Sequence, residues 1–515
     1  MVFKQPFYST SGVVASEHPL ASLIGSRILE KGNSIDAAVA ASLVLAVTLP
    51  HLGGIGGDFF ALVRDPNGKV YFVDGSGYAP SKLTRKFLLS LGYTSMPMHG
   101  PLSINVPGMI DGLRVVWEKW GTIEWHELVD QASRIADKGF IVTRSLALSL
   151  KDLYDKLSAD PGSRETYYRN GIPREGNLVS FKGLAQALKL IGDDPRSFYE
   201  GEIAEKIVDY VRSRGGVLEL EDLKGYRASL GEPISTGYRD RIVYEMPPST
   251  QGITTLHMLK LLEEYDLRSI GLNSSERVKL FLKAAQIAYK VRDSYITDPR
   301  YMGLSVDYLL SSEFIEMLKG EMRKEALRDY RKTHGPDGDT TFFAVADKDG
   351  WIVAGIQSLF YPFGSYITEP RFNITLNSRA SSFSLDENHV NRLEPLKKTM
   401  HTLSAMIVED DNRVLAIGLS GSHFRPLLHA QLLTNIIDYE LSIQEAIEYP
   451  RFIWYLWTNN VDYEEGLNTS GLGGYVLKKK PYPSRLGVAA IVEVKEGVRA
   501  GYTDIRGDGI PIGLP

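Results

Sequence analysis

The 515-residue sequence contains no cysteine. This absence excludes disulfide bonds, iron–sulfur clusters, thiolate zinc sites and a cysteine nucleophile. A charge excess is also missing, because 58 Lys and Arg stand against 63 Asp and Glu, which gives a formal net charge of −5. The sequence therefore carries no electrostatic signature of nucleic-acid or anionic-membrane binding. With 43% hydrophobic and 23% charged residues, its composition is that of a globular protein with a sizeable core.

Long hydrophobic runs are missing as well. The N-terminal segment lacks an apolar stretch of the length that a secretory signal requires, which predicts a cytoplasmic location. The longest apolar run, Ile35 to Leu49, contains Asp36 and is shorter than the about 20 residues that cross a bilayer. We expect a buried helix there. The ten histidines form no H-x-H or HExxH pair, so the sequence predicts no metal site.

Two glycine-containing motifs bear on the choice of function. The cluster from His51 to Asp58 (HLGGIGGD) follows a helical pattern and lacks the third glycine of G-x-G-x-x-G, so we expect no nucleotide cofactor. A helix-to-strand turn with closely approaching backbones is the simpler interpretation. The second motif, Gly418-Leu-Ser420-Gly421, lacks the spacing of a hydrolase nucleophile elbow. It predicts a tight turn, whose backbone N–H groups could still face an oxyanion.

The sequence changes character near residue 340. Before it, apolar spacing predicts amphipathic helices around 128–136, ending at Gly139, and around 203–211. The stretch 330–339 (YRKTHGPDGD) has the composition of an exposed loop. After it, three hairpin patterns and two helices follow, one over 425–439 and one opened by an S-x-x-E capping motif at Ser442. We expect antiparallel sheet covered by helices.

Asp339-Thr340-Thr341 lies where this loop meets the first strand. Threonine is common at strand starts because it is β-branched, which is the plain interpretation. A chemical interpretation stays open beside it. Cleavage of the bond before Thr340 would free an α-amine that serves as the base for the hydroxyl of the same residue. Such a site needs no histidine, cysteine or metal.

Seven segments, in order, carry a resemblance to a known family: NSIDAAVAASLVLAVTLPHLGGIGGDFF, INVPGMIDGL, FYEGEIAEKIVDYVRSRGGVLELEDLKGY, MPPSTQG, DTTFFAVADKDG, YELSIQEAIEYPRF and GYTDIRGDG. From Val14 to Gly509 the chain resembles the gamma-glutamyltransferase family of N-terminal-nucleophile (Ntn) hydrolases. The resemblance implies an α+β fold, the four-layer αββα sandwich. It also implies a precursor that cleaves itself before Thr340, giving regions 1–339 and 340–515 of one intertwined globular unit.

The resemblance also implies a catalytic set. Thr340 is the nucleophile that takes the acyl group from an amide. Ser358 stands where the family holds a second hydroxyl beside the nucleophile. The family's oxyanion-hole pair falls on Gly421 and Ser422, and backbone N–H donors survive a side-chain change if Ser422 can adopt the required dihedral angles.

The substrate-binding positions depart from the family pattern. The arginine for the substrate carboxylate falls on Ser76, with Tyr78 nearby, and serines replace the acidic anchor for the α-amino group. An asparagine near the nucleophile becomes phenylalanine, as does the histidine after the Thr-Thr pair, and a Ser-Ser pair becomes His-Thr. The positions that depart are Ser76, Phe342, Phe360, Ser381, Ser382, His401 and Thr402. Lost charge-assisted partners predict poor binding of a glutamyl head group.

We therefore expect a gamma-glutamyltransferase-like amide hydrolase or acyltransferase, acting on a small-molecule amide or peptide-like substrate, with acyl specificity moved away from glutamate. Arg379 is a candidate partner for an anionic acyl tail, and a structural ion pair is its alternative role. A protein that never matures and acts as a binding or scaffold protein is the alternative function. Self-association stays open.

Overall fold

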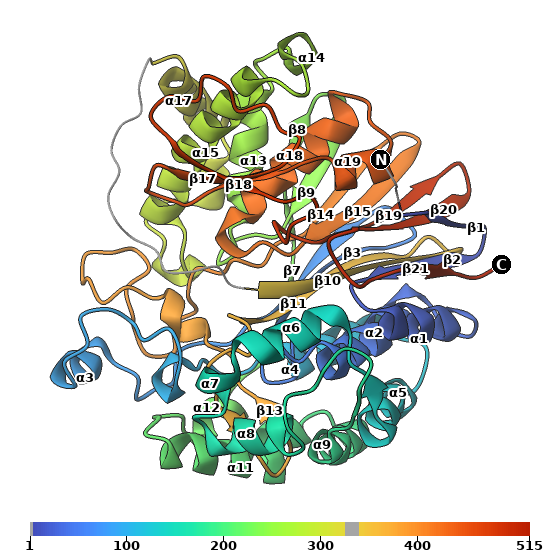
Figure 1. Cartoon of the computed structure of the whole chain (residues 1–515), viewed down its shortest axis with the longest axis vertical. Helices are drawn as coiled ribbons and strands as arrows, with labels where there is room; N and C mark the ends of the chain where they lie inside the picture. Colours follow the sequence, from blue (N-terminus) through green and yellow to red (C-terminus); the bar gives the residue numbers. More distant parts are fainter. Residues whose placement is uncertain (1–3, 325–338) are drawn as a thin grey trace.

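The computed structural model describes residues 4–324 and 339–515. Two seven-stranded sheets lie face to face in the middle of the molecule, and helices cover both outer faces (Figure 1). This arrangement is the predicted α+β sandwich of αββα layers. The predicted loop over 330–339 lies, apart from its last residue, outside the described residues.

Both central sheets contain strands from before and after residue 339, and all their neighbouring strands are antiparallel. The first runs in the order β21 (Pro511–Gly513), β2 (Gly12–Ser16), β10 (Asp339–Asp347), β11 (Ile352–Phe360), β3 (Asp58–Arg64), β4 (Val70–Gly75) and β7 (Ser229–Gly231). The second runs β1 (Phe7–Ser9), β20 (Val498–Thr503), β19 (Ala489–Lys495), β15 (Arg413–Leu419), β14 (Met406–Asp410), β9 (Arg241–Glu245) and β8 (Ile234–Tyr238). The three predicted hairpins are confirmed as β10–β11, β14–β15 and β19–β20.

The helices around the first sheet form one layer, at the bottom of Figure 1. Its main members are α1 (Pro19–Leu29), α2 (Ser34–Thr48), α4 (Met109–Trp120), α5 (Trp125–Lys138), α6 (Arg144–Asp152), α8 (Pro161–Tyr168), α9 (Lys182–Asp193) and α11 (Glu202–Ser213). Every residue of α2 is buried, and Asn33 and Asp36 close its N-terminus as a capping box. The expected buried helix is confirmed, as is the end of α5 at Gly139, which has a positive φ of 93°.

The second helical layer covers the other sheet, at the top of Figure 1. It consists mainly of α13 (Gly252–Leu262), α15 (Ser275–Tyr295), α17 (Ser312–Met322), α18 (Arg425–Ile437) and α19 (Ile443–Glu448). Pro426 lies in the first turn of α18, and Ser442 and Glu445 form the predicted capping box of α19. Both helices are therefore confirmed.

Short elements complete the chain. The helices are α3 (Arg85–Ser90), α7 (Tyr154–Leu157), α10 (Ser197–Glu200), α12 (Leu220–Lys224), α14 (Leu267–Ile270) and α16 (Val306–Leu309). The strands are β5 (Phe140–Ile141), β6 (Leu178–Val179), β12 (Thr368–Glu369), β13 (Ile374–Thr375), β16 (Phe452–Trp454), β17 (Asn460–Glu464) and β18 (Val476–Lys480).

The register between β10 and β11 is interrupted at Thr340. Asp339 pairs with Phe360, but Thr341 pairs with Gln357, so two residues of β11, Ser358 and Leu359, face the single residue Thr340. Such a β-bulge bends the strand and changes the direction of a side chain. The bulge therefore sets the local geometry of the predicted nucleophile.

The glycine cluster after α2 brings two backbones together beside this bulge. A Cβ atom on Gly57 would lie 2.5 Å from the carbonyl oxygen of Ser358, and one on Gly56 would lie 2.3 Å from that of Thr375. Only glycine fits these positions. The expected helix-to-strand turn is confirmed.

Candidate active site

Thr340 and Ser358 lie together in the buried interior of the first sheet, 2% and 1% exposed. The Ser358 Oγ accepts a hydrogen bond of 2.7 Å from the N–H of Phe360. Phe360 has a φ of 83°, a left-handed conformation that is unusual for a bulky residue. The serine hydroxyl thus holds the end of β11 in this strained turn, directly opposite the predicted nucleophile.

Phe360 contacts residues on both sides of the candidate site. Its backbone pairs with that of Asp339. The guanidinium carbon of Arg379 lies 4.3 Å from the centroid of the Phe360 ring, and the ring of His423 lies 6.2 Å away, edge-on. A cation over an aromatic face is attracted by the ring quadrupole. The structure thus brings Phe360 and Arg379 together one residue from Thr340.

Arg379 belongs to a buried ion network with Asp58 and His401. Its Nε donates to Asp58 Oδ2 at 3.1 Å, and His401 Nε2 lies 3.0 Å from the same oxygen. His401 Nδ1 accepts from the N–H of Leu403, so the proton is on Nε2 and the ring donates to Asp58. All three side chains are at most 1% exposed. Arg379 therefore forms a structural ion pair, which is the alternative role that the sequence analysis gave it.

Burial and charge set the protonation of this network. Burial, followed by the charge of Arg379, lowers the pKa of His401 to about 4. Burial by itself raises the pKa of Asp58, but His401 and Arg379 outweigh it, so the net pKa of Asp58 lies below its ordinary value. At neutral pH the network therefore holds a carboxylate, a guanidinium and a neutral imidazole.

Arg379 and two predicted serines have buried polar atoms without a hydrogen-bond partner in the described part of the chain. Arg379 Nη1 donates to Thr402 Oγ1 at 3.3 Å. Its Nη2 is buried and has no hydrogen-bond partner in the described part of the chain, and the same holds for the hydroxyls of Ser382 and Ser422. A buried donor without an acceptor is unfavourable unless a ligand or water supplies one.

The predicted oxyanion pair lies in a tight turn after β15. Gly421 has a φ of 150° and Ser422 a φ of 44°, so Ser422 does adopt the left-handed conformation that the sequence made a condition. No hydrogen bond among residues 4–324 and 339–515 uses the amide N–H of either residue. Gly418, three residues earlier, packs against the ring of Phe342, two residues after Thr340. The turn therefore lies at the same end of the sandwich as Thr340.

The hydroxyl groups of three predicted substrate residues already donate hydrogen bonds to other protein groups. The hydroxyl and N–H of Ser76 both donate to Asp74 Oδ1. The Tyr78 hydroxyl donates to the carbonyl of Asp222 at 2.8 Å, and the Ser381 hydroxyl donates to that of Ser378 at 2.7 Å. Each bond uses the hydroxyl proton and leaves the oxygen only its capacity to accept a hydrogen bond.

Sequence reasoning missed three residues. Lys398 contacts Asp74 Oδ2 at 2.7 Å, so a cation stands beside Ser76 after all. Asp58 is the carboxylate of the ion network, and Gln251 binds two carbonyls beside the site. Asp58 and Gln251 lie inside two of the segments that carry the family resemblance, where the only signal was a polar residue beside apolar or glycine neighbours.

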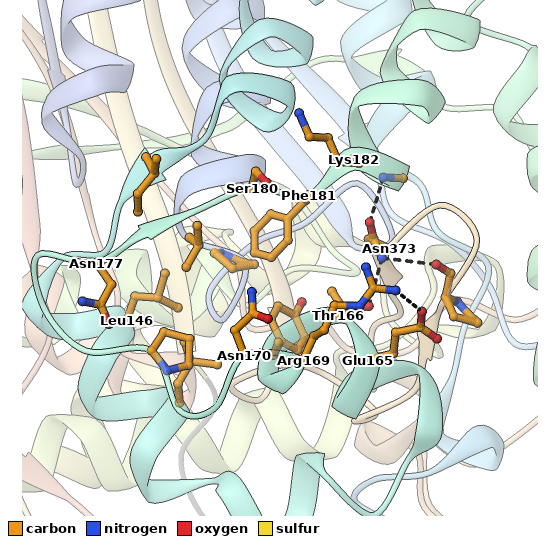
Figure 2. Close-up of a pocket in the computed structure, with 18 of the residues that line it drawn as sticks. Leu146, Glu165, Thr166, Arg169, Asn170, Asn177, Ser180, Phe181, Lys182 and Asn373 are labelled. Carbon is orange, nitrogen blue, oxygen red and sulfur yellow. Dashed lines mark hydrogen bonds and ion pairs between the residues drawn. The ribbon is translucent and has the colours of Figure 1, made fainter.

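A separate polar pocket of about 620 Å³ lies between α6, α8, the start of α9 and residues 370–373 (Figure 2). None of the predicted site residues lines it. Its side chains largely satisfy one another: Arg169 pairs with Glu165 at 3.0 Å, and Asn373 accepts from the N–H of Gly183 at 2.8 Å. The pocket therefore lies apart from the predicted catalytic and substrate residues.

The two facing antiparallel sheets between two helical layers are the fold of an Ntn hydrolase. The pattern of the Gamma-glutamyltranspeptidase family matches residues 21–514, and the chain belongs to this family of enzymes. It is 35% identical to the Glutathione hydrolase-like YwrD proenzyme of Bacillus subtilis (98% of this chain, 99% of the relative). It is 31% identical to the Oxamate amidohydrolase proenzyme of Klebsiella pneumoniae (98% and 99%).

A solved structure supports the same placement. Cephalosporin acylase from Bacillus halodurans superposes with a TM-score of 0.93 at 31% identity, over 100% of this chain and 98% of that one. Within the described residues, no helix is long and apolar enough to cross a membrane.

Proposed function

We propose that the protein is a self-processing amide hydrolase or acyltransferase with Thr340 as its nucleophile. The observation that carries the proposal is the position of Thr340, buried opposite a β-bulge and at the same end of the sandwich as a turn whose two amide N–H groups have no described acceptor. Two full-length relatives are named proenzymes, which supports maturation by cleavage.

The reaction follows from these groups. In the precursor, the Thr340 Oγ attacks the carbonyl carbon of residue 339, and water hydrolyses the resulting ester, which leaves Thr340 with a free α-amine. In the mature enzyme this amine takes the hydroxyl proton while Oγ attacks the substrate amide carbon. The N–H groups of Gly421 and Ser422 stabilise the oxyanion. The proton then passes to the leaving amine, and water or a second amine takes the acyl group.

The acyl specificity differs from that of a glutamyl enzyme. Both oxygens of Asp58 are already occupied, Oδ1 by the N–H of Gly77 and Oδ2 by Arg379 and His401. This carboxylate therefore has little capacity left for a substrate ammonium group. Arg379 instead offers the unused Nη2 donor. Acyl groups that lack an α-amine and end in a carboxylate or carbonyl oxygen fit this arrangement.

A matched set of p-nitroanilides tests this function. Purified protein is assayed on gamma-glutamyl, glutaryl and butyryl p-nitroanilide, which differ only in the head group. We expect the highest kcat/KM for the glutaryl compound, because its carboxylate gains the Arg379 donor and no ammonium is left unpaired. A clear preference for the gamma-glutamyl compound would refute the altered specificity, and turnover of none of the three would refute the proposed activity.

A further inference from the structure

A buried glutamine holds two backbone carbonyls beside the candidate site. Gln251, immediately before α13, is fully buried. Its Nε2 donates to the carbonyl oxygen of Thr402 at 2.8 Å and to that of Ser422 at 2.7 Å. A side-chain amide nitrogen has two hydrogens, so both are used. One side chain therefore joins the segment that contacts Arg379 to the predicted oxyanion turn.

Arg292 fixes the orientation of this amide. It lies in α15, is fully buried, and donates from Nη1 to Gln251 Oε1 at 2.9 Å. Since a guanidinium can only donate, the oxygen of the amide must face it and the nitrogen must face the carbonyls. The guanidinium carbon lies 4.6 Å from the ring centroid of Tyr289, whose hydroxyl donates to the carbonyl of His423. Two successive carbonyls of the turn are thus held from α13 and α15.

The bonds on either side of Ser422 control the direction of its N–H group. The carbonyl of Gly421 accepts from the N–H of Phe424 at 2.8 Å. Because a peptide unit is planar with its N–H opposite its C=O, this bond sets the direction of the Ser422 N–H. Gln251 holds the next peptide plane through the Ser422 carbonyl. Ser422 lies between the two fixed planes, which keeps it at a φ that non-glycine residues disfavour.

We propose that Gln251 is a positioning residue for the oxyanion turn, and that Arg292 orients its amide. Gln251 does not touch the substrate, and it acts by keeping the Ser422 N–H group directed at the developing oxyanion. The proposal rests on the proposed function and deepens it, since the turn has a catalytic role only if Thr340 is the nucleophile.

Gln251→Met tests the proposal, because it keeps the length of the side chain and removes its three hydrogen bonds, the two to the carbonyls and the one from Arg292. We expect kcat on the preferred anilide to fall about 10- to 100-fold with KM within about threefold, since a displaced donor weakens binding of the transition state alone. An alkylboronic acid that becomes tetrahedral on the Thr340 Oγ should lose affinity in the same proportion. The affinity for the planar carboxylic acid product should not change.

Gln431→Met is the matched control. Gln431 is also buried, in α18, and its Nε2 donates to the carbonyls of Leu427 at 3.2 Å and Phe452 at 2.9 Å, away from the turn. We expect a similar loss of stability with kcat within about twofold of the wild type. Equal losses of kcat in the two variants would show a general packing effect and overturn the proposal.

Two further outcomes decide the case. A folded and cleaved Gln251→Met protein with wild-type kcat and boronate affinity would overturn the proposal while leaving the proposed function intact. If Gln251→Met does not fold, Arg292→Met leaves the glutamine in place but lets its amide rotate. It should lower kcat about three- to tenfold with the same loss of boronate affinity, and an unchanged kcat would contradict the positioning role.

Discussion

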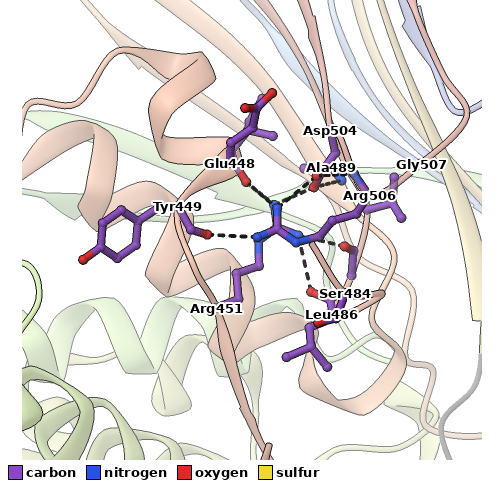
Figure 3. Close-up of polar contacts among 12 residues, drawn as sticks. Glu448, Tyr449, Arg451, Ser484, Leu486, Ala489, Asp504, Arg506 and Gly507 are labelled. Carbon is purple, nitrogen blue, oxygen red and sulfur yellow. Dashed lines mark hydrogen bonds and ion pairs between the residues drawn. The ribbon is translucent and has the colours of Figure 1, made fainter. Parts of the chain in front are cut away.

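Two buried ion networks, one around Arg506 and one around Arg379, both pair arginine with carboxylates. They differ in how many of the arginine N–H groups have a hydrogen-bond partner. In the network near the C-terminus, part of which Figure 3 draws, Arg506 uses all five of its N–H groups. It donates to Glu464 twice, to Asp504, and to the carbonyls of Ile447 and Tyr449. Although burial lowers the pKa of Arg506, the two carboxylates outweigh it and raise that pKa.

Arg379, under the candidate site, is also fully buried but has a single carboxylate partner. Burial is the largest effect there and lowers the pKa of Arg379 to about 10. Its Nη2 has no partner in the described part of the chain. A complete network such as that of Arg506 has no donor left for a ligand and serves stability. An incomplete network can bind a ligand.

The largest effect should come from breaking the complete network. Arg506→Met leaves Glu464 and Asp504 buried without their main cation, and loss of one partner of a buried pair costs about 3–5 kcal/mol. Urea unfolding should show this loss in the free energy of unfolding. Arg268→Met removes the exposed pair with Glu440 and should change it little. Equal stability of Arg506→Met and wild type would contradict a structural role.

The next effect concerns the unused amides of the oxyanion turn. Ser422→Pro removes one N–H donor and cannot keep the φ of 44°, because proline fixes φ at about −65°. It should lower kcat at least about 10²- to 10³-fold, whereas Ser422→Ala keeps the amide and should change kcat little. Steady-state kinetics on the preferred anilide measure both. If alanine is as damaging as proline, the side chain matters and the backbone explanation fails.

Removal of the incomplete network's guanidinium should have a smaller effect that depends on the substrate. Arg379→Met should lower kcat/KM for glutaryl p-nitroanilide about 10- to 100-fold, the range expected for one lost charge-assisted hydrogen bond of about 1.5–3 kcal/mol. The butyryl compound should lose far less. Arg379→Lys keeps a cation and should retain part of the preference. An equal loss on both substrates would show that Arg379 only supports the fold.

The smallest expected effect is on how the free energy of unfolding depends on pH, through His401 of the incomplete network. Since the folded-state pKa of His401 is about 4 against an ordinary 6.5, the unfolded chain gains a proton that the folded chain does not as pH falls from 6.5 to 4. The free energy of unfolding must therefore decrease over this range. His401→Gln keeps a donor without titrating. It should reduce the stability difference between pH 7 and pH 5 by up to about 2 kcal/mol, and an unchanged difference would contradict the neutral imidazole.

Local patterns in the sequence predicted much of the fold. The apolar run of α2, the Asp-Gly turn of the β10–β11 hairpin and the capping motif of α19 are short-range signals, and all three elements are present. The ion network of the site was not predictable in this way. Arg379 and Asp58 are 321 positions apart, and His401 and Asp58 are 343 apart. Only folding brings their charges together.

Cleavage before Thr340 tests the central claim most directly. Intact-mass spectrometry and an SDS gel of the purified wild type should show two chains, 1–339 and 340–515. Thr340→Ala should give one chain of about the full 57.3 kDa and no anilide turnover, and Thr340→Ser should be cleaved in part. An uncleaved, inactive wild-type chain would instead support the scaffold alternative. Wild-type activity in Thr340→Ala would contradict the assignment of Thr340 as the nucleophile.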